Sequence, residues 1–594
     1  MNHLNNNLIN ALNSLNLREI KKNIRIIEKK NKSKPIIKIA ITRTFTLEGQ
    51  TDYLKLALNT LDYNLNLKIG NLNNIEQEIN NLNSDIIKWK PDIIVVLWRI
   101  EELLPELDKN LNLPKNKFNN YFKIIKTRIY NLIKNFFRIY NCPLIISNLP
   151  TAQLGIKYNL NNDLRELIER INLFLLEKVR SKNNIYLFDF CGWSNSVGKN
   201  FLDLKMDLYA KQAVSSHYIN SFALSLARTI RPLIRSSAKA VVVDLDNTLW
   251  GGILGEDGVE NLNISHEFPG NIYRKIQTKI LSLKKQGFLI FLISKNNLKD
   301  VEAAFKFHKK MPLKLADFNC IMVNWKEKHI NLKKIAKEYN IGYSSFVFVD
   351  DQKFEQDQMR FNLKEVNVLD ISEDPLDIYE KLDSCQLLDK AYQTKEDHLR
   401  SKDYIANTKR KNLKTIAKNS QDYLKSLSLK ADIFKLNNKN IERAFEMVHK
   451  TNQFNLRTER YTKKELINIK NNNKYITLMI SLSDRFGDQG IIGLICGKTQ
   501  NEKIIFIENF LLSCRAIGRG AEEVLFYIFL KKLKNKKINI IKAEYLASEK
   551  NSQVKNLYLN FGMQLITKTK NKIFYEAKLP IKFNKPKWIK INEK

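Results

Sequence analysis

Two aspartates one residue apart follow an apolar run in the segment AVVVDLDNTLWGG, residues 240–252. The run has the length and composition of a buried β-strand, and Asp244 and Asp246 stand at its carboxyl end. In an extended chain, positions i and i+2 face the same way, so both carboxylates are expected to point into one crevice. Two unpaired carboxylates repel each other, and a divalent cation such as Mg²⁺ relieves that repulsion. The spacing therefore predicts a magnesium-binding pair of acids.

Further polar residues stand at or near the ends of other predicted strands. Ser294 ends the run FLIFLIS, Lys328 precedes a predicted helix, and Asp350 and Asp351 end SSFVFVDD. Any one of these alone could be a turn residue, a helix cap or a solvent-exposed lysine. Together they supply what phosphoryl transfer needs: a carboxylate nucleophile, a general acid, groups that hold the phosphate and acids that hold Mg²⁺. The combination predicts a phosphotransferase site.

The elements that must position these side chains form an α/β pattern in residues 236–390. The intervals 252–288 and 294–328 are too short to hold a folded lid, so we expect an open cleft. Strands are predicted at 239–246, 288–293 and 345–350, with helices at about 272–286, 298–309 and 331–340.

Residues 1–235 alternate apolar runs with helical stretches, which predicts an α/β layer of parallel strands. The first 32 residues favour an amphipathic helix over a signal peptide. The segment RPLIRSSA at 231–238 indicates a domain junction. The predicted strands are 36–42, 91–98, 143–147 and 185–190.

Residues 431–580 change to successive apolar strands with short turns, which is typical of antiparallel pairing. We expect a helical connector at 391–430 before them and a loose basic tail at 581–594 after them. The predicted strands are YITLMIS, IIGLICG, IIFIENFLLS, 539–545 and one near 572–577, with helices at 521–534 and 551–560.

The formal net charge of +37 would by itself suggest a nucleic-acid partner. Lysine is spread along the whole length, however, and no lysine block is interleaved with aromatic residues. We therefore expect a basic solvated surface and no nucleic acid. No apolar run is long enough to span a membrane. The six cysteines form no C-x-x-C pair, which argues against zinc and disulfides and for a reducing cytoplasm.

The segment CRAIGRG at 514–520 follows a predicted strand and opens a predicted helix. Backbone N–H groups around Arg515, Gly518 and Gly520 would lie at the helix N-terminus, ready for a pyrophosphate. Cys514 could be a small buried residue at the strand end. Alternatively, the helix N-terminus and Arg515 could lower its pKa, so that the thiolate carries an acyl group. These residues leave both interpretations open, whereas Cys496 is expected in the core.

Several long segments resemble the haloacid dehalogenase (HAD) superfamily of phosphotransferases, in its FkbH-like branch. They are DLDNTLWGGILGEDGV, LISKNN and VNWKEKHINLKKIAKEYNIGYSSFVFVDD, extended by TNQFNLRTERYT, DRFGDQGIIG and LLSCRAIGRGAEE. The resemblance implies a Rossmann-like phosphatase domain without a large cap. It also implies roles: Asp244 as nucleophile and Mg²⁺ ligand, Asp246 as general acid/base and source of a backbone carbonyl for the metal, Thr248 as support for the first carboxylate within the phosphate site, Ser294 and Lys328 as phosphoryl-binding groups, and Asp350 backed by Asp351 as Mg²⁺ ligands.

The chain departs from the FkbH-like pattern at two places. Gln352 and Lys353 follow the acidic pair where the family usually has Asn-Pro, and His329 follows the motif lysine where the family usually has Ser. Neither change removes an acidic group or the lysine. Lys326 is the second candidate for the lysine role.

The flanking regions resemble two further folds. RAIGRG and NSQVKNLYLNFGM are similar to the acyl-coenzyme A loop and late helix of GNAT acetyltransferases, which implies a GNAT-like α+β domain. Residues 1–235 loosely resemble an SGNH-hydrolase-like α/β domain. An active SGNH hydrolase would need a serine after the first strand, where this chain has Thr44 and Thr46, and an aspartate three residues before His217, which is missing. We expect a degenerate domain that binds or scaffolds.

The FkbH-like resemblance implies an enzyme that takes a small phosphorylated acyl substrate such as 1,3-bisphosphoglycerate. It would remove phosphate and load the acyl unit onto the phosphopantetheine of an acyl carrier protein, with Cys514 as the intermediate carrier. One alternative is a phosphatase fused to an acyltransferase that uses coenzyme A in polysaccharide synthesis. The other is a scaffold with a dead site, against which the intact aspartates argue.

Overall fold

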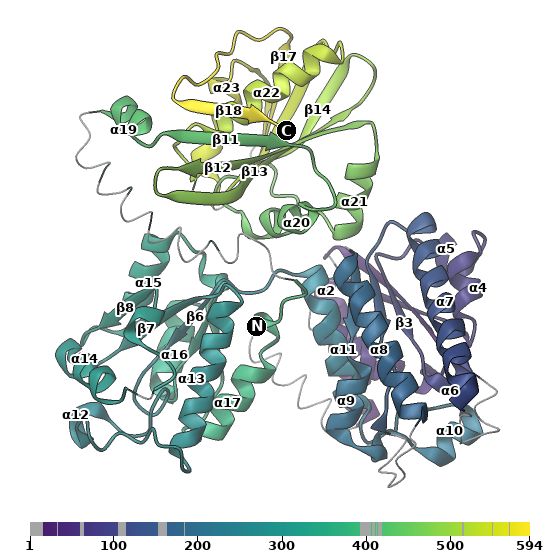
Figure 1. Ribbon diagram of the computed structural model, residues 1–594. Helices are drawn as coiled ribbons and strands as arrows, with labels where there is room; N and C mark the ends of the chain where they lie inside the picture. Colours follow the sequence, from purple (N-terminus) through teal and green to yellow (C-terminus); the bar gives the residue numbers. More distant parts are fainter. Residues whose placement is uncertain are drawn as a thin grey trace. The chain divides into compact units, whose positions relative to one another are not determined.

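The computed structural model describes residues 16–594 except 33, 60–63, 105–114, 153–162, 183, 310, 514–515, 549, 570 and most of 393–418. The chain separates into two compact units. One comprises Met1–Arg235 with Tyr461–Ile469, and the other comprises Ser236–Arg460 with Lys470–Lys594. The described residues form a mixed α/β, multidomain chain built around three sheets (Figure 1).

The first sheet is parallel and has the strand order β2-β1-β3-β4-β5. Its strands are β1 (Ile36–Arg43), β2 (Asn64–Leu72), β3 (Ile93–Leu97), β4 (Leu144–Ser147) and β5 (Ile185–Phe188). The sequence predicted four of the five. It missed β2, whose residues are mostly half-buried and polar, because a half-covered edge strand needs no apolar run.

Helices cover this sheet on both faces, and nearly every residue of β1, β3 and β4 is therefore buried. Alternate strand residues share one core with α4, α7 and α8, while α3 packs against α2 and α11. The helix α2 buries Ile20, Ile24 and Ile27, which confirms an amphipathic helix there, whereas residues 1–15 lie outside the described residues. The helices are α2 (Leu17–Asn31), α3 (Thr51–Asn59), α4 (Ile75–Asn80), α5 (Asp85–Trp89), α6 (Ile100–Leu103), α7 (Lys115–Ile139), α8 (Asp163–Ser181), α9 (Phe190–Val197), α10 (Leu204–Ala210) and α11 (Ile219–Ile234).

The second sheet is also parallel and has the order β10-β9-β6-β7-β8. Val241 and Val243 pack into one core and Ala240 and Val242 into another, so the central strand β6 is buried on both faces. The strands are β6 (Ala240–Val243), β7 (Leu289–Ser294), β8 (Cys320–Val323), β9 (Phe346–Val349) and β10 (Asn367–Val368). The sequence predicted β6, β7 and β9 and missed the short strands β8 and β10.

The helices α13, α14 and α15 are close to the three predicted, whereas α12, α16 and α17 were not predicted, and no folded lid interrupts the described residues of this domain. Residues 252–288 hold only α12 and α13, and the described residues of 294–328 hold α14, a 3-10 turn and β8. The helices are α12 (Leu254–Asp257), α13 (Gly270–Lys285), α14 (Leu298–Phe307), α15 (Lys328–Tyr339), α16 (Lys353–Asn362) and α17 (Pro375–Ser384).

The third sheet is mixed and has the order β16-β17-β15-β14-β13-β12-β11-β18. Its antiparallel centre confirms the predicted succession of strands. The strands are β11 (Leu429–Phe434), β12 (Tyr475–Asp484), β13 (Gly487–Thr499), β14 (Ile504–Leu512), β15 (Ile540–Leu546), β16 (Gln564–Lys568), β17 (Lys572–Lys578) and β18 (Ile589–Glu593). The helices of this region are α19 (Ser420–Ser426), α20 (Ile441–Lys450), α22 (Ala521–Asn535) and α23 (Leu557–Asn560), whereas most of α21 (Lys463–Asn471) belongs to the first unit.

Three expectations for this region need correction. The tail at 581–594 is not loose, because β18 pairs in parallel with β11, whose first residue, Leu429, falls inside the expected connector. The expected helix at 551–560 is a 3-10 turn followed by the single turn α23. The fully exposed strand β16 was missed. Most of the connector lies outside the described residues. Nowhere in the described parts of the chain does a helix combine the length and apolar character needed to cross a bilayer.

Candidate active site

Three carboxylates meet where β6 and β9 end side by side. These strands are parallel neighbours with Val243 paired to Val349, so the residues that follow them lie at one edge of the sheet. The backbone N–H of Asp244 donates to the carbonyl of Val349 at 3.1 Å and continues the pairing. One carboxylate oxygen from each of Asp244, Asp350 and Asp351 lies within 4.8 Å of the others, and all three residues are buried.

Lys328 supplies the positive charge nearest to these acids. It is the first residue of α15, not a loop residue before it, and its side chain is 3% exposed. Its Nζ lies 3.0 Å from Asp244 Oδ2 and 2.7 Å from Asp350 Oδ2. Burial by itself would lower the pKa of Lys328, but the two carboxylates outweigh it and raise the pKa. The side chain is therefore a permanent ammonium.

One ammonium does not balance three buried carboxylates. Burial raises the pKa of Asp350 well above its usual value, Asp244 raises it further, and Lys328 only partly offsets both effects. Burial and Asp244 likewise raise the pKa of Asp351 to about 6. Without a further positive charge, the cluster would hold protons near neutral pH.

One carboxylate oxygen of the cluster has no hydrogen-bond donor among the described residues. Asp244 Oδ1 is buried and has no hydrogen-bond partner among the described residues, although its other oxygen is held by Lys328. A buried carboxylate oxygen without a partner is costly, and three clustered carboxylates are the oxygen ligands that Mg²⁺ prefers. The residues present therefore fit a divalent cation held by Asp244, Asp350 and Asp351.

Asp246 lies in a different environment from these three acids. Its carboxylate accepts hydrogen bonds from Trp250 Nε1 at 2.9 Å, the Leu254 N–H at 3.1 Å and Asn296 Nδ2 at 2.8 Å. Burial nevertheless raises its pKa, against the effect of those donors. The side chain is fixed by its donors and is not part of the three-carboxylate group. The sequence analysis expected both the carboxylate and the backbone carbonyl of Asp246 to contact the metal. The carboxylate is engaged elsewhere, so only the contact from the backbone carbonyl stays a prediction.

Asn296 is a functional candidate that the sequence analysis missed. Its Nδ2 donates to Asp246 Oδ2 at 2.8 Å and to Ser294 Oγ at 3.1 Å, and the residue is buried. It therefore joins the predicted general acid to the predicted phosphate-binding hydroxyl. The available signal was its place two residues after a strand-ending serine, on the same side of an extended chain.

Thr248 does not support Asp244 as expected. Its hydroxyl donates to Asp351 Oδ1 at 3.0 Å and accepts from the Asp351 N–H at 3.3 Å. The turn after β6 passes through a left-handed residue, Asn247, at φ 50°, and carries the threonine to the end of the neighbouring strand. Because it is fully buried and engaged with Asp351, Thr248 is a positioning residue here and not an open phosphate ligand.

The departures from the family pattern leave the cluster intact. The backbone N–H of Gln352 donates to Asp350 Oδ1 at 3.2 Å, and Lys353 is exposed and paired with Asp370. His329 Nε2 lies 3.2 Å from the exposed carboxylate of Glu327. Lys326, the second candidate for the lysine role, is exposed and is not among the ion-pair partners of the cluster.

The predicted second site in the C-terminal domain is only partly described. Cys514 and Arg515 lie outside the described residues. Gly518 and Gly520 both have left-handed φ angles, 76° and 86°, and Gly520 caps α22. A Cβ at Gly520 would come within 3.0 Å of the indole of Trp588. The backbone therefore favours glycine at both positions, and close packing against Trp588 adds a second reason at Gly520, whatever the loop binds.

The first turn of α22 carries two half-buried acids. Burial raises the pKa of Glu522 to about 7, and it raises the pKa of Glu523 as well. One oxygen of Glu522 is buried and has no hydrogen-bond partner among the described residues. Cys496 is fully buried in β13, and burial raises its pKa, as expected for a core cysteine.

The motif TNQFNLRTERYT fills a gap in the third sheet. β14 pairs with β15 only over 504–507, and beyond that the strands diverge. The Leu456 N–H donates to the Phe510 carbonyl, the Leu512 N–H to the Phe454 carbonyl, and the Leu546 N–H to the Leu456 carbonyl, at 2.8–3.1 Å. The segment is thus hydrogen-bonded to both strands, close to the end of the strand that leads to Cys514.

Comparison with known proteins gives a family match for one domain. A family model described as the FkbH N-terminal domain matches residues 49–230. No curated protein matches the chain. Residues 49–230 are therefore similar to an FkbH N-terminal domain, and the expected SGNH-like character of residues 1–235 stays a prediction.

Solved structures give further matches. The N-terminal part of BF1531 from Bacteroides fragilis, which contains a phosphatase domain and was crystallised with Mg, matches with 24% identity and a TM-score of 0.55. The match covers 62% of this chain and 99% of that one, which shows a shared fold. Two N-acetyltransferases each cover 25% of the chain with TM-scores of 0.21: the ribosomal-protein-S18-alanine enzyme from Escherichia coli (12% identity, 94% of that chain) and PaiA from Thermoplasma acidophilum with coenzyme A (18%, 99%).

Proposed function

We propose that the chain is an Mg²⁺-dependent phosphatase of the FkbH type that also handles the acyl part of its substrate. The observation that carries the phosphatase proposal is the buried Asp244 carboxylate, with one oxygen on Lys328 and the other without a partner. A nucleophile needs a free oxygen and a neighbouring charge that stabilises the phosphoryl group, and this arrangement supplies both.

Hydrolysis of the phosphoester takes two steps. An oxygen of Asp244 attacks the phosphorus and forms an aspartyl phosphate, while Asp246 gives its proton to the departing oxygen. Lys328 and Ser294 hold the phosphoryl oxygens. Water then attacks the phosphorus, Asp246 takes the proton of that water, and phosphate leaves with Asp244 restored. A bound Mg²⁺ would supply further positive charge against the phosphoryl oxygens.

Asp246 suits the role of proton carrier because its environment is distinct from that of the nucleophile. Its pKa is raised by burial, which makes it a more ready proton acceptor than an ordinary aspartate, and its three donors stabilise the negative charge when the proton leaves. Asp244 has one oxygen without a partner, whereas both oxygens of Asp246 accept hydrogen bonds. Such contrasting surroundings of two carboxyl groups are typical of a nucleophile and acid pair.

The acyl step is the finer part of the proposal and is supported by the FkbH-like resemblance around Cys514. The Cys514 thiolate would attack the acyl carbon of a small acyl phosphate, with phosphate as the leaving group. The aspartate site would hydrolyse the remaining phosphoester. The thiol of a phosphopantetheine-bearing carrier protein would then take the acyl unit by thioester exchange, which frees Cys514.

Phosphate release tests the first part. We expect the purified chain with Mg²⁺ to release phosphate from at least one of 3-phosphoglycerate, glycerol 3-phosphate, glucose 6-phosphate and p-nitrophenyl phosphate. Chelation by EDTA and the Asp244→Asn variant should each abolish the release. Asp300→Asn, an exposed aspartate on α14, is the matched control and should retain full activity. Release that survives in Asp244→Asn would overturn the assignment of the nucleophile.

Intact-mass analysis tests the acyl step separately. After incubation with 1,3-bisphosphoglycerate, the chain should gain a glyceryl adduct that is lost in Cys514→Ala and kept in Cys496→Ala. Addition of a phosphopantetheinylated carrier should discharge the adduct. Acyl transfer from coenzyme A with no adduct on the chain would instead support the coenzyme A-dependent alternative.

A further inference from the structure

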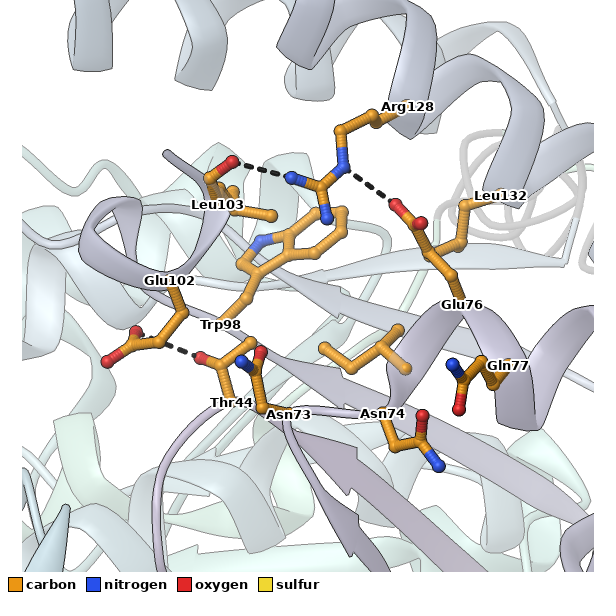
Figure 2. A pocket seen from close by; sticks show the side chains of 11 residues that line it. Thr44, Asn73, Asn74, Glu76, Gln77, Trp98, Glu102, Leu103, Arg128 and Leu132 are labelled. Atoms are coloured by element: carbon orange, nitrogen blue, oxygen red, sulfur yellow. Dashed lines mark hydrogen bonds and ion pairs between the residues drawn. The ribbon is translucent and has the colours of Figure 1, made fainter. Parts of the chain in front are cut away.

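A cavity of about 120 Å³ opens at the carboxyl ends of β1, β2 and β3 in the N-terminal domain. Its wall includes Thr44, which directly follows β1, and Trp98, which directly follows β3. In the order β2-β1-β3, the chain turns to opposite sides of β1, so the cavity lies at the switch point of the sheet. Ligands of open parallel sheets bind at this place. Figure 2 shows the side chains around it.

Every charged group on the cavity wall already has a partner of opposite charge. Arg128 Nε lies 2.7 Å from Glu76 Oε1, and its Nη1 donates to the Leu103 carbonyl at 2.5 Å. Glu102 pairs with the buried Arg99 and accepts the Thr44 hydroxyl at 3.2 Å. Figure 2 shows Arg128 with Glu76 and Leu103 on one part of the wall and Glu102 with Thr44 on another. The charged groups of the wall are therefore engaged with protein partners, which leaves no free cation or anion for an ionic ligand.

Thr44 is also poorly placed to act as a nucleophile. Its hydroxyl donates to Glu102 and accepts from the backbone N–H of Arg99 at 3.2 Å. Glu102 is held by two nitrogens of Arg99, which keeps it from acting as a strong base. The residue at the position sought for a serine nucleophile is thus fixed within the wall, which favours binding over hydrolysis.

Three carboxamides on the cavity wall have open hydrogen-bonding groups. Asn73, Asn74 and Gln77 come from the turn after β2 and the start of α4. Their side chains have no hydrogen-bond partner within the described part of the chain, and the side chain of Asn74 does not cap α4. Each carboxamide can donate and accept at once. A hydroxyl group has the same dual character, so it is the natural complement of such a wall.

The remaining wall is apolar and buried. Ile75, Leu103, Leu132 and Trp98 line the cavity with exposed fractions of 6% or less. Trp98 is fixed by donation from its Nε1 to the Ser147 carbonyl at 2.7 Å. An apolar floor beside open carboxamides suits a ligand with one C–H face and several hydroxyl groups.

We infer that this cavity binds an uncharged, hydroxylated small molecule of the size and character of a monosaccharide. The open carboxamides recognise its hydroxyl groups, and the apolar floor packs against its ring. The binding is independent of the phosphatase site in the second unit and persists when that site is inactivated.

Saturation-transfer NMR on the full chain tests this inference with four probes of similar size. They are glucose, N-acetylglucosamine, glucuronate and glucosamine. We expect saturation transfer to at least one of the two neutral sugars, and at least threefold less to the anionic and cationic ones, because the wall has no free charge. Asn74→Ala combined with Gln77→Ala should remove the signal. Asn73 is left unchanged because its φ of 55° disfavours alanine.

The control is Asn120→Ala, an exposed amide on α7 that does not line the cavity, which should keep the full signal. Thermal unfolding of each variant shows that the fold is retained, and Asp244→Asn should bind as the parent does. The inference is overturned if no probe receives saturation, if only the charged sugars do, or if the double variant binds as well as the parent.

Discussion

Each of the two parallel sheets has a candidate site at its switch point, but the charged side chains at the two sites differ. In the first, the switch point lies between β1 and β3, and in the second it lies between β6 and β9. At the first, Arg99 and Arg128 each have an acidic partner. At the second, three carboxylates share one lysine.

The comparison separates where a site lies from what it does. Strand order fixes the place, because diverging connections leave the carboxyl ends of two neighbouring strands uncovered. Charge balance then decides the chemistry. A balanced wall suits recognition of a neutral molecule, whereas an unbalanced acidic cluster with an unpartnered oxygen suits a cation and phosphoryl transfer.

Removing the cation at the β1 edge should have the largest effect on stability. Arg99→Met leaves Glu102 and Asp207 buried without their partner, and we expect a loss of about 3–5 kcal/mol in the free energy of unfolding. Denaturant unfolding followed by tryptophan fluorescence measures it. Arg128→Met, at a half-exposed pair, is the control and should cost less than about 1 kcal/mol. Equal losses would mean that the buried network is not what stabilises this edge.

Removing the cation at the β6 edge should affect activity more than stability. Lys328→Met takes away the ammonium that holds the phosphoryl oxygens, and we expect kcat/KM for phosphoester hydrolysis to fall about 10²–10³-fold. The Mg²⁺ concentration for half-maximal activity should fall too, because Lys328 no longer competes for the carboxylates. Lys326→Met, two residues earlier and exposed, should match the parent. A comparable loss in Lys326→Met would transfer the role to that lysine.

Glu522, a half-buried acid that belongs to neither of these strand edges, should show only a stability effect. The pKa of Glu522 is raised to about 7 in the folded state from 4.5. The protonated form therefore stabilises the fold below pH 4.5, and that contribution is lost as the pH rises through 7. At pH 8 the free energy of unfolding of Glu522→Gln should exceed that of the parent by up to about 3 kcal/mol, with a correspondingly higher unfolding temperature, and at pH 4.5 the two should differ little.

The control for this pH dependence is Glu502→Gln in the exposed turn between β13 and β14. Its unfolding temperature should follow that of the parent at every pH. Phosphoester hydrolysis by Glu522→Gln should be unchanged. A Glu522→Gln advantage of the same size at pH 4.5 and pH 8 would show that the effect does not come from ionisation.

The smallest effect is expected at Asn296. Asn296→Ala removes the link between Asp246 and Ser294 but leaves all charges in place, so we expect kcat to fall about tenfold with KM nearly unchanged. Steady-state kinetics separates the two parameters. Asn297→Ala, the exposed neighbour, is the control. A rise in KM without a change in kcat would make Asn296 a binding residue and not a positioning one.

Much of the β6 edge could be predicted from the sequence because its signals are local. An apolar run that ends in Asp, Ser or Asp-Asp marks both a strand and the polar group at its end, as at Asp244, Ser294 and Asp350. Strands without such a run were missed. β2 and β16 carry polar or exposed residues, and β18 forms only because β11, more than 150 residues earlier in the chain, provides a partner edge.

The details of the site could not be read from spacing. The separation of i and i+2 placed Asp244 and Asp246 on one face, but only the fold supplies the donors that hold Asp246 away from the acidic cluster. The left-handed turn at Asn247 takes Thr248 to Asp351. The open carboxamides of the N-terminal cavity follow a strand that the sequence did not reveal.

The sequence by itself determined the residue types available at each strand end, and so the acidic character of one edge and the absence of a serine at the other. The tertiary structure alone decided which of these groups meet. Pairing of charges depends on distances of a few ångströms between residues up to about a hundred positions apart, as for Asp244 and Asp350 on their shared lysine. Those distances are set by strand order and helix packing, which no local pattern encodes.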